Sequence, residues 1–173
     1  SSTDQVVVTV LPSPVASITP LSATICAGSS VVLTASGGGT YLWNPGGATT
    51  ASITVSPVSN SSYTVIVTAA NGCTDSEVAN VTVNPAPTAF NVTGGGMICP
   101  GGSAEVGLSG SATGIEYQLK RDGVNVGSPV AGTGSALNFG PQNTVGIYTV
   151  SARNTSTNCS RDMNGSVSIY IDN

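Results

Sequence analysis

The chain carries the same short pattern twice, and this repeat limits how it can fold. Residues 24–35 read TICAGSSVVLTA, and residues 97–108 read MICPGGSAEVGL. In both copies an aromatic segment, a Tyr-Thr-Val segment and a second cysteine then follow in the same order. A repeat of this kind indicates an array of similar modules. We expect such an array to space, adhere or bind rather than to catalyse a reaction.

The repeat divides the 173 residues into two small modules. Module 1 is expected over residues 14–84 and module 2 over residues 85–173. The boundary reads Asn-Pro-Ala-Pro over 84–87, and prolines make a short linker stiff and extended. Residues 1–13 are expected to be the trailing strand and linker of a preceding module, or a donor strand.

Alternating apolar and polar residues, with turn residues every 8–12 positions, predict an all-β chain. This spacing is typical of immunoglobulin-like β-sandwiches, and we expect two of them in tandem, arranged end to end. In module 1 the expected strands are 16–19, 30–35, 40–43, 52–55, 62–69 and 78–83. In module 2 they are 89–93, 103–109, 115–121, 124–127, 136–139, 146–154 and 166–171. Asp122-Gly123 predicts a hairpin turn that module 1 lacks.

Four aromatic residues are predicted to lie in the cores. Trp43 is expected at the centre of module 1, and Tyr117 takes its place in module 2. Tyr63 and Tyr148 each begin a later strand, where sandwiches of this type carry a tyrosine corner. Tyr41 lies on the same strand face as Trp43, so this pair could instead form a platform on which a sugar stacks.

The four cysteines, Cys26, Cys73, Cys99 and Cys159, occur at repeated positions, and the chain has no histidine. They are interpreted as structural disulfides of an oxidising, extracellular environment. One pairing is within modules, Cys26 with Cys73 and Cys99 with Cys159. These partners would lie at opposite ends of a sandwich whose strands span about 26 Å, too far for a disulfide. A bridge between modules, Cys26 with Cys159, therefore stays open, and Cys73 and Cys99 would then pair with modules before and after.

Residues 4–14 align with residues 77–87, which end module 1. The first copy therefore resembles the last strand of a module that is otherwise missing. This chain could be part of a longer array. Alternatively, Val6, Val8 and Val10 could form a donor strand that completes the sheet of an identical subunit and builds a filament. A plain added strand in module 1 is the third alternative.

Composition and charge exclude several functions. The net charge of −4, with only four lysines and arginines, argues against nucleic acid as a partner. No apolar run reaches 18 residues, so membrane insertion is not expected. Without histidine there is no Ser-His-Asp or Cys-His arrangement. The carboxylates are scattered, and Glu116 and Asp122, which flank one hairpin, are expected to be solvated. We expect no enzyme activity, no cofactor and no metal, with a single calcium through Asp75 or Asp162 as a minor alternative.

The stretch ICAGSSVVLTASGG, followed by YLWNPG, SYTV, NGCTD and VTVNPAP, resembles the Ig-like/PKD-like tandem repeat modules of secreted or surface proteins of Bacteroidota, including gliding adhesins. The match is close over residues 14–87 and looser in module 2. The resemblance implies an extracellular or cell-surface location and a structural spacer, stalk or filament-forming module. The alternative is a carbohydrate- or surface-binding module of a secreted multidomain protein. The implied partners are neighbouring modules or identical subunits, and polysaccharide in the alternative, where the insertion at 115–129 is the candidate binding element.

Overall fold

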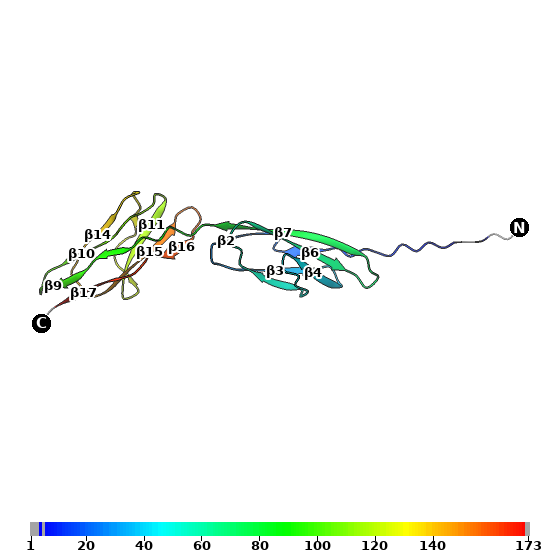
Figure 1. Ribbon diagram of the computed structural model, residues 1–173, viewed down its shortest axis with the longest axis horizontal. Coiled ribbons are helices and arrows are strands. Elements are labelled where there is room, and N and C mark those ends of the chain that lie inside the picture. Colours follow the sequence, from blue (N-terminus) through cyan, green and yellow to red (C-terminus); the bar gives the residue numbers. More distant parts are fainter. Residues whose placement is uncertain (1–3, 5, 172–173) are drawn as a thin grey trace. The chain divides into compact units, whose positions relative to one another are not determined.

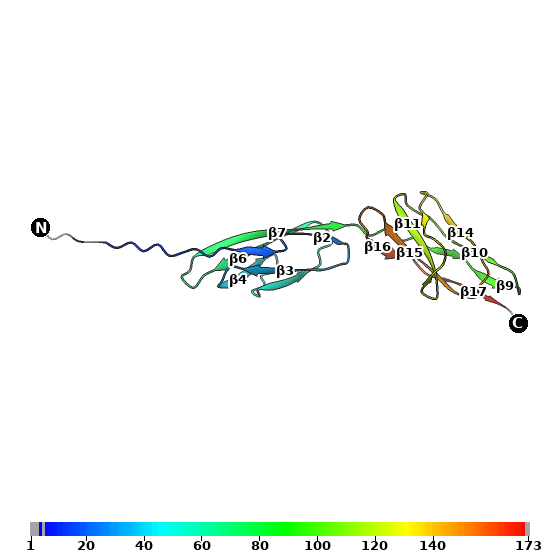
Figure 2. The same cartoon turned by 180° about the vertical axis from the view of Figure 1, so that it is seen from behind.

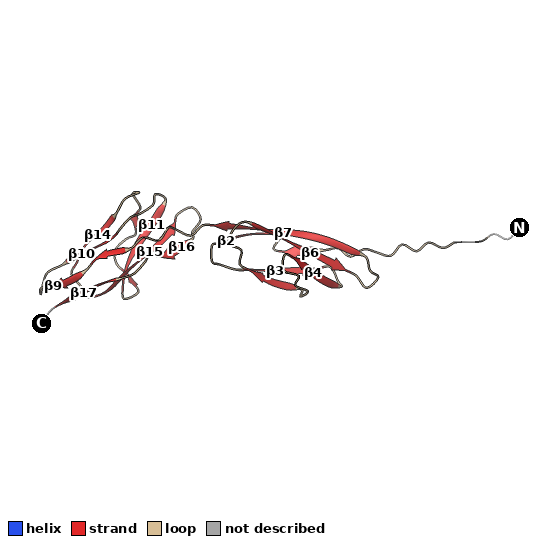
Figure 3. Ribbon diagram, in the orientation of Figure 1, coloured by secondary structure: helices blue, strands red, loops and turns tan. Residues whose placement is uncertain are grey.

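The computed structural model describes residues 4 and 6–171, and it divides into two compact units, 1–83 and 84–173. These units contain modules 1 and 2, and each is described by itself. Every regular element of the described residues is a β-strand (Figure 3). The chain is therefore all-β, as the alternating sequence pattern predicts.

Module 1 consists of two sheets. Its strands are β1 (Ser17–Thr19), β2 (Ser22–Cys26), β3 (Val31–Ser36), β4 (Thr40–Asn44), β5 (Ser52–Val55), β6 (Ser61–Thr68) and β7 (Thr74–Asn84). One sheet has the order β1-β3-β5 and the other β2-β7-β6-β4. Figure 1 shows β6 beside β7, with which it pairs in antiparallel register. Chain order alternates between the sheets as in an immunoglobulin-like sandwich.

The core of module 1 is built from alternate residues of these strands. Leu33 on β3 and Val65 and Val67 on β6 are fully buried, while the residues between them face outward. Trp43 on β4 is 1% exposed, and its Nε1 donates a hydrogen bond to the carbonyl oxygen of Thr50 at 2.9 Å. The predicted central position of Trp43 is confirmed.

Module 2 repeats this arrangement with additional strands. They are β8 (Val92–Gly94), β9 (Gly96–Ile98), β10 (Ala104–Leu108), β11 (Ile115–Arg121), β12 (Val124–Asn125), β13 (Val130–Ala131), β14 (Leu137–Gln142), β15 (Gly146–Asn154), β16 (Ser160–Asp162) and β17 (Val167–Ile171). The small sheet has the order β14-β10-β8. The large sheet has the order β12-β11-β15-β17-β9, while β13 also pairs with β11 and β16 with β15. Figure 2 shows β9 and β17 side by side, and they pair in parallel.

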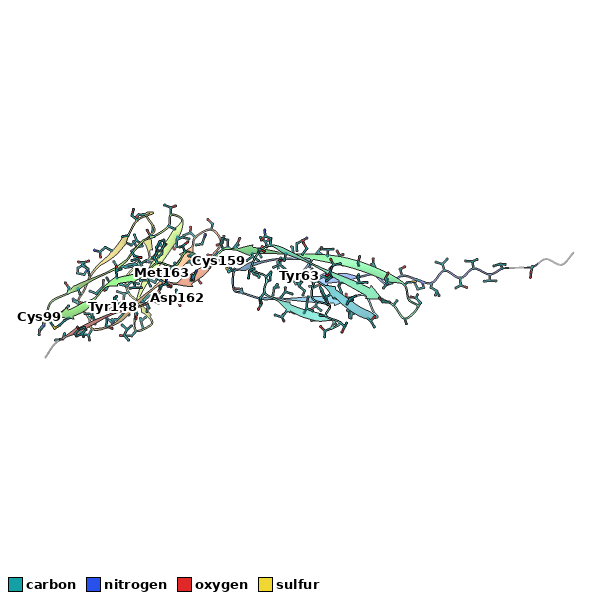
Figure 4. The ribbon with its side chains drawn as sticks, viewed as in Figure 1. Tyr63, Cys99, Tyr148, Cys159, Asp162 and Met163 are labelled. Atoms are coloured by element: carbon teal, nitrogen blue, oxygen red, sulfur yellow. The ribbon has the colours of Figure 1, made fainter. Side chains whose placement is uncertain are left out.

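Two tyrosines organise the core of module 2. Tyr117 on β11 is fully buried, and its hydroxyl oxygen accepts a hydrogen bond from the backbone N–H of Ala112 at 2.9 Å. Tyr148 on β15 is also buried (Figure 4), and its hydroxyl donates to the carbonyl oxygen of Thr144 at 2.7 Å. This bond back to a nearby upstream carbonyl is a tyrosine corner. The core positions predicted for Tyr117 and Tyr148 are confirmed, and so is that of Tyr63 in module 1.

The predicted hairpin turn is present in module 2. Asp122 and Gly123 have φ angles of 50° and 82°, and Arg121 pairs with Val124 across them. Two consecutive residues with positive φ make a type I′ turn, which matches the twist of the flanking strands. The Asp122 carboxylate also accepts a hydrogen bond from the N–H of Ile147 at 2.9 Å, which ties the turn to β15.

Four strands were not expected from the sequence: β2, β9, β13 and β16. No residue of β2 is fully buried, so the strand lacks the alternation of buried apolar and exposed polar residues by which a strand is predicted from sequence. It follows β1 directly and joins the other sheet, where the N–H of Asn80 donates to the carbonyl of Leu21 at 3.0 Å. The strands β9, β13 and β16 have at most three residues each. Of the four, β2 and β9 pair with strands that are distant in the sequence, whereas β13 and β16 are short additions beside the nearby strands β11 and β15.

Candidate functional site

The four cysteines are in two different states. Cys26 and Cys159 are disulfide-bonded, whereas Cys73 and Cys99 have free thiols. The alternative in which the cysteines pair within modules is therefore wrong, because one cysteine of each such pair is free. For module 2 the reason is visible in Figure 4, where Cys99 and Cys159 lie at opposite ends of the module. A disulfide requires Cα atoms within about 7 Å, so these two cannot bond.

The segment that contains the candidate donor strand is exposed. Val6, Val8 and Val10 are 86%, 82% and 88% exposed, and residues 6–16 are loop in Figure 3. Their repeat counterparts on β7 have the opposite environment, since Ala79 and Val81 are 0% and 1% exposed. This segment therefore has the alternating apolar residues of a final strand, but no sandwich covers them. The alternative of an added strand in module 1 is wrong, because the segment pairs with no described strand of that module.

The linker that follows this segment is held by module 1. The side-chain amide of Asn71 donates to the carbonyl oxygen of Pro12 at 2.9 Å, and Asp75 accepts a hydrogen bond from the N–H of Ala16 at 2.8 Å. A side chain at Gly37 would place its Cβ 2.5 Å from the carbonyl oxygen of Val15, so glycine permits the close approach. Residues 12–16 are thus held by the loop between β6 and β7, by the start of β7 and by the loop between β3 and β4.

The sugar-stacking platform considered for Tyr41 and Trp43 is not formed. Trp43 is buried in the core, and Tyr41 is half-buried and packs against that core. Asp75 is engaged with the backbone of Ala16. Within the described residues, no group of three His, Cys, Asp or Glu side chains is placed to hold a metal ion. The described part of the chain also contains no helix able to cross a membrane.

Module 2 carries a polar pocket of about 280 Å³ on its large sheet. Three neighbouring elements supply the walls: the middle of β11, the facing part of β15 with the start of β16, and the hairpin that follows β11. The lining residues are Glu116, Gln118, Lys120, Asn125, Pro129, Ser151, Ala152, Arg153 and Ser160. Ligand pockets typically measure about 300–1,000 Å³, so this one suits a small group. We call it the hairpin pocket.

Strand register places the polar side chains of the hairpin pocket together. Glu116 lies opposite Arg153, and Gln118 lies opposite Ser151. Arg153 lies in turn opposite Ser160 on β16. Residues two apart on a strand share a face, so Glu116, Gln118 and Lys120 all point to the same side of β11. The pocket is thus the outer face of β11 and β15, closed on one side by the hairpin.

The hydrogen bonds of the hairpin pocket fix two of its side chains. Arg153 donates to Glu116 at 3.3 Å and to the side-chain oxygen of Asn158 at 3.0 Å. The side-chain amide nitrogen of Gln118 donates to the carbonyl oxygens of Leu119 and Val126 at 2.7 and 3.0 Å. Gln118 therefore holds the hairpin against β11, and its own carbonyl oxygen is left as an acceptor.

The insertion at 115–129 is apparent in the sequence, but most residues of this site are not. Glu116 is a solvated charge, as expected, with a side chain that is 39% exposed, but it also forms an ion pair with Arg153 that the sequence did not indicate. Gln118, Ser151 and Ser160 carry no signal of their own in so polar a sequence. The inward and outward alternation of β11 and β15 could have placed Gln118 and Ser151 on outer faces, but not opposite each other.

No protein-family model and no curated protein matches the chain. Among solved structures, murine CEACAM1b matches with 14% identity and a TM-score of 0.41, over 91% of this chain and 100% of that one. The fibronectin(III)-like modules of Clostridium thermocellum CbhA match with 11% identity and a TM-score of 0.42, over 91% and 94%. A Ca²⁺-stabilised adhesin of an Antarctic bacterium that binds ice matches with 17% identity and a TM-score of 0.42, over 93% of this chain and 49% of that one. Since all three TM-scores are below 0.5, the sandwich assignment rests on the strand order of the chain itself.

Proposed function

We propose that this chain is a structural segment of an extracellular protein built from repeated immunoglobulin-like modules. In this proposal the modules follow one another end to end and act as a spacer or stalk of a surface adhesin. The sequence resemblance to surface repeats of Bacteroidota supports this role. So do the all-β modules and the presence of disulfide-bonded cysteines, which persist in oxidising environments.

The observation that carries the proposal is the contrast between two aligned segments. Val8 and Val81 occupy the same position of the repeat, yet Val8 is 82% exposed and Val81 is 1% exposed. In both modules the last strand is already paired, β7 with β6 and β17 with β15. Among the described residues, the place of the last strand is therefore already filled in both modules. Residues 4–14 are therefore best explained as the end of a preceding module of the same array.

The state of the cysteines agrees with this proposal. Four cysteines allow three full pairings, but two of the four cysteines are free. We propose that Cys26 and Cys159 are bonded to each other, which is the bridge between modules that the sequence left open. Cys73 and Cys99 are then the residues that would bond cysteines of the modules before and after. Small-angle scattering is the test of an end-to-end arrangement, and a profile of a compact globule would contradict it.

Strand donation is tested separately by the association state. We expect the chain, with its free thiols alkylated, to stay monomeric in native mass spectrometry across micromolar concentrations. Val8→Lys changes a residue of the inward pattern, and Val7→Lys is its matched control on the opposite face of the segment. Oligomers that Val8→Lys abolishes and Val7→Lys preserves would show that the strand is donated to another subunit, and the proposal would fail.

A second function, binding of polysaccharide or a surface, is favoured by the hairpin pocket. Most of the residues that line it have polar or charged side chains, and the exceptions are Pro129 and Ala152. Hydroxyl-rich ligands need such a mixture of donors and acceptors. A glycan array probed with the full chain tests this function. Binding is expected to weaken in Gln118→Ala, which releases the hairpin, and an array without any bound glycan would exclude the function.

A further inference from the structure

We infer that the hairpin pocket binds a carboxylate-bearing sugar, that is, a uronic acid unit of an acidic polysaccharide. This inference rests on the second of the two functions above and names its ligand class. It concerns a site that a pure spacer would not need. Three properties of the pocket support it: its charge, the identity of its uncharged side chains and its size.

The charge of the pocket is opposite to that of the chain. The chain has a formal net charge of −4 and only four lysines and arginines, all in module 2. Two of the four, Lys120 and Arg153, line the pocket, against a single carboxylate, Glu116. The pocket therefore has an excess of one positive charge, which favours an anionic ligand.

The two cations have different partners. Arg153 is paired with Glu116 and oriented by Asn158, so its charge is largely satisfied within the module. Lys120, by contrast, has no carboxylate oxygen within 4 Å in the described part of the chain. An ammonium group has three donors and no acceptor, so Lys120 has donors to offer to a ligand carboxylate. We assign Lys120 as the group that selects the acidic sugar.

The uncharged residues suit the remainder of a sugar ring. Ser151 and Ser160 each present a hydroxyl that both donates and accepts, and Asn125 presents an amide. The carbonyl oxygen of the Gln118 amide adds an acceptor, because the amide nitrogen is held by backbone carbonyls. The volume of about 280 Å³ is small for a ligand pocket and fits one ring better than several.

The test is a titration of the ¹⁵N-labelled full chain, followed by NMR. The probes are sodium D-galacturonate, D-galactose, which has a hydroxymethyl group in place of the carboxylate, and sodium acetate, which has a carboxylate but no sugar ring. We expect saturable shifts with galacturonate at the backbone amides of β11 and β15 and at the side-chain amides of Gln118 and Asn125. Galactose and acetate are expected to bind roughly tenfold more weakly or not at all.

Two variants distinguish a specific site from a general charge effect. Lys120→Gln is expected to weaken galacturonate binding roughly tenfold, since one charge-assisted contact is lost. Arg161→Gln removes the same charge from an exposed residue of module 2 that does not line the pocket, and it should leave binding unchanged. Equal binding of galactose, equal weakening by both variants, or no binding of galacturonate would each overturn the inference. A glycan array that detects only neutral sugars would overturn it as well, while leaving the second function intact.

Discussion

At the scale of single residues, each module is centred on one aromatic side chain of equivalent position. Trp43 lies on β4, which pairs with β6, and Tyr117 lies on β11, which pairs with β15; both side chains are buried. Each uses its polar atom to bond the backbone of a nearby loop, Thr50 in one case and Ala112 in the other. A buried aromatic residue needs such a partner for its polar atom, and here the partner also fixes the loop.

Trp43→Ala is expected to destabilise module 1 by about 3–5 kcal/mol, through the lost burial and the cavity left behind. Leu42→Ala is the matched control, because Leu42 is the preceding residue of β4 and is 46% exposed. Hydrogen exchange of the amides of module 1 measures both variants without relying on tryptophan fluorescence. Similar exchange in the two variants would contradict the central role of Trp43.

Tyr148→Phe removes only the hydroxyl of the tyrosine corner and its bond to Thr144. We expect a loss of about 1 kcal/mol, typical of one hydrogen bond, confined to module 2. The chain has a single tryptophan, Trp43, so fluorescence follows module 1 while circular dichroism follows both modules. Urea unfolding should therefore shift in circular dichroism but not in fluorescence. Tyr170→Phe, at a 54% exposed position, should shift neither signal.

At the scale of elements, the hairpin after β11 is the main difference between the modules. Its type I′ turn depends on positive φ at Asp122 and Gly123. The same hairpin contributes Asn125 and Pro129 to the hairpin pocket. The geometry of a two-residue turn thus helps to shape a candidate binding site several residues away.

Gly123→Ala is expected to cost about 1–2 kcal/mol, because a side chain at φ 82° is strained. Thermal unfolding followed by circular dichroism measures this loss. Val124→Ala is the control on the same hairpin, since Val124 is 69% exposed and has little packing to lose. An equal effect of both substitutions would mean that the turn does not constrain the hairpin.

At the scale of the whole molecule, the cysteines give the sharpest prediction. Alkylation of the non-reduced chain is expected to label Cys73 and Cys99, which have free thiols, and to spare Cys26 and Cys159. Peptide mapping without reduction should then find one linked peptide, Cys26 with Cys159. A peptide that links Cys26 with Cys73, or label on Cys159, would contradict both the observed states and the proposed bridge.

The sequence was most informative where structure depends on neighbouring residues. The limits of β5, β11 and β15 agree with the predicted strands, because alternation over four or more residues is a local signal. It was least informative for β2 and β9. These short strands exist because β7 and β17 offer unpaired edges, and nothing within three to five residues encodes that.

The amino-acid sequence by itself determined that the chain is all-β, that its aromatic residues lie in two cores and that Asp122-Gly123 turns a hairpin. Each of these follows from the period of a strand or from the φ preferences of a dipeptide. Only the tertiary structure decided which cysteines are bonded, that Val8 is exposed while Val81 is buried, and that Glu116, Lys120 and Arg153 share one pocket. The shared pocket depends on the register between β11 and β15, which are some thirty residues apart, and register is set by the packing of whole sheets rather than by local sequence. The cysteine states and the contrast between Val8 and Val81 depend on which distant segments each residue meets in the fold.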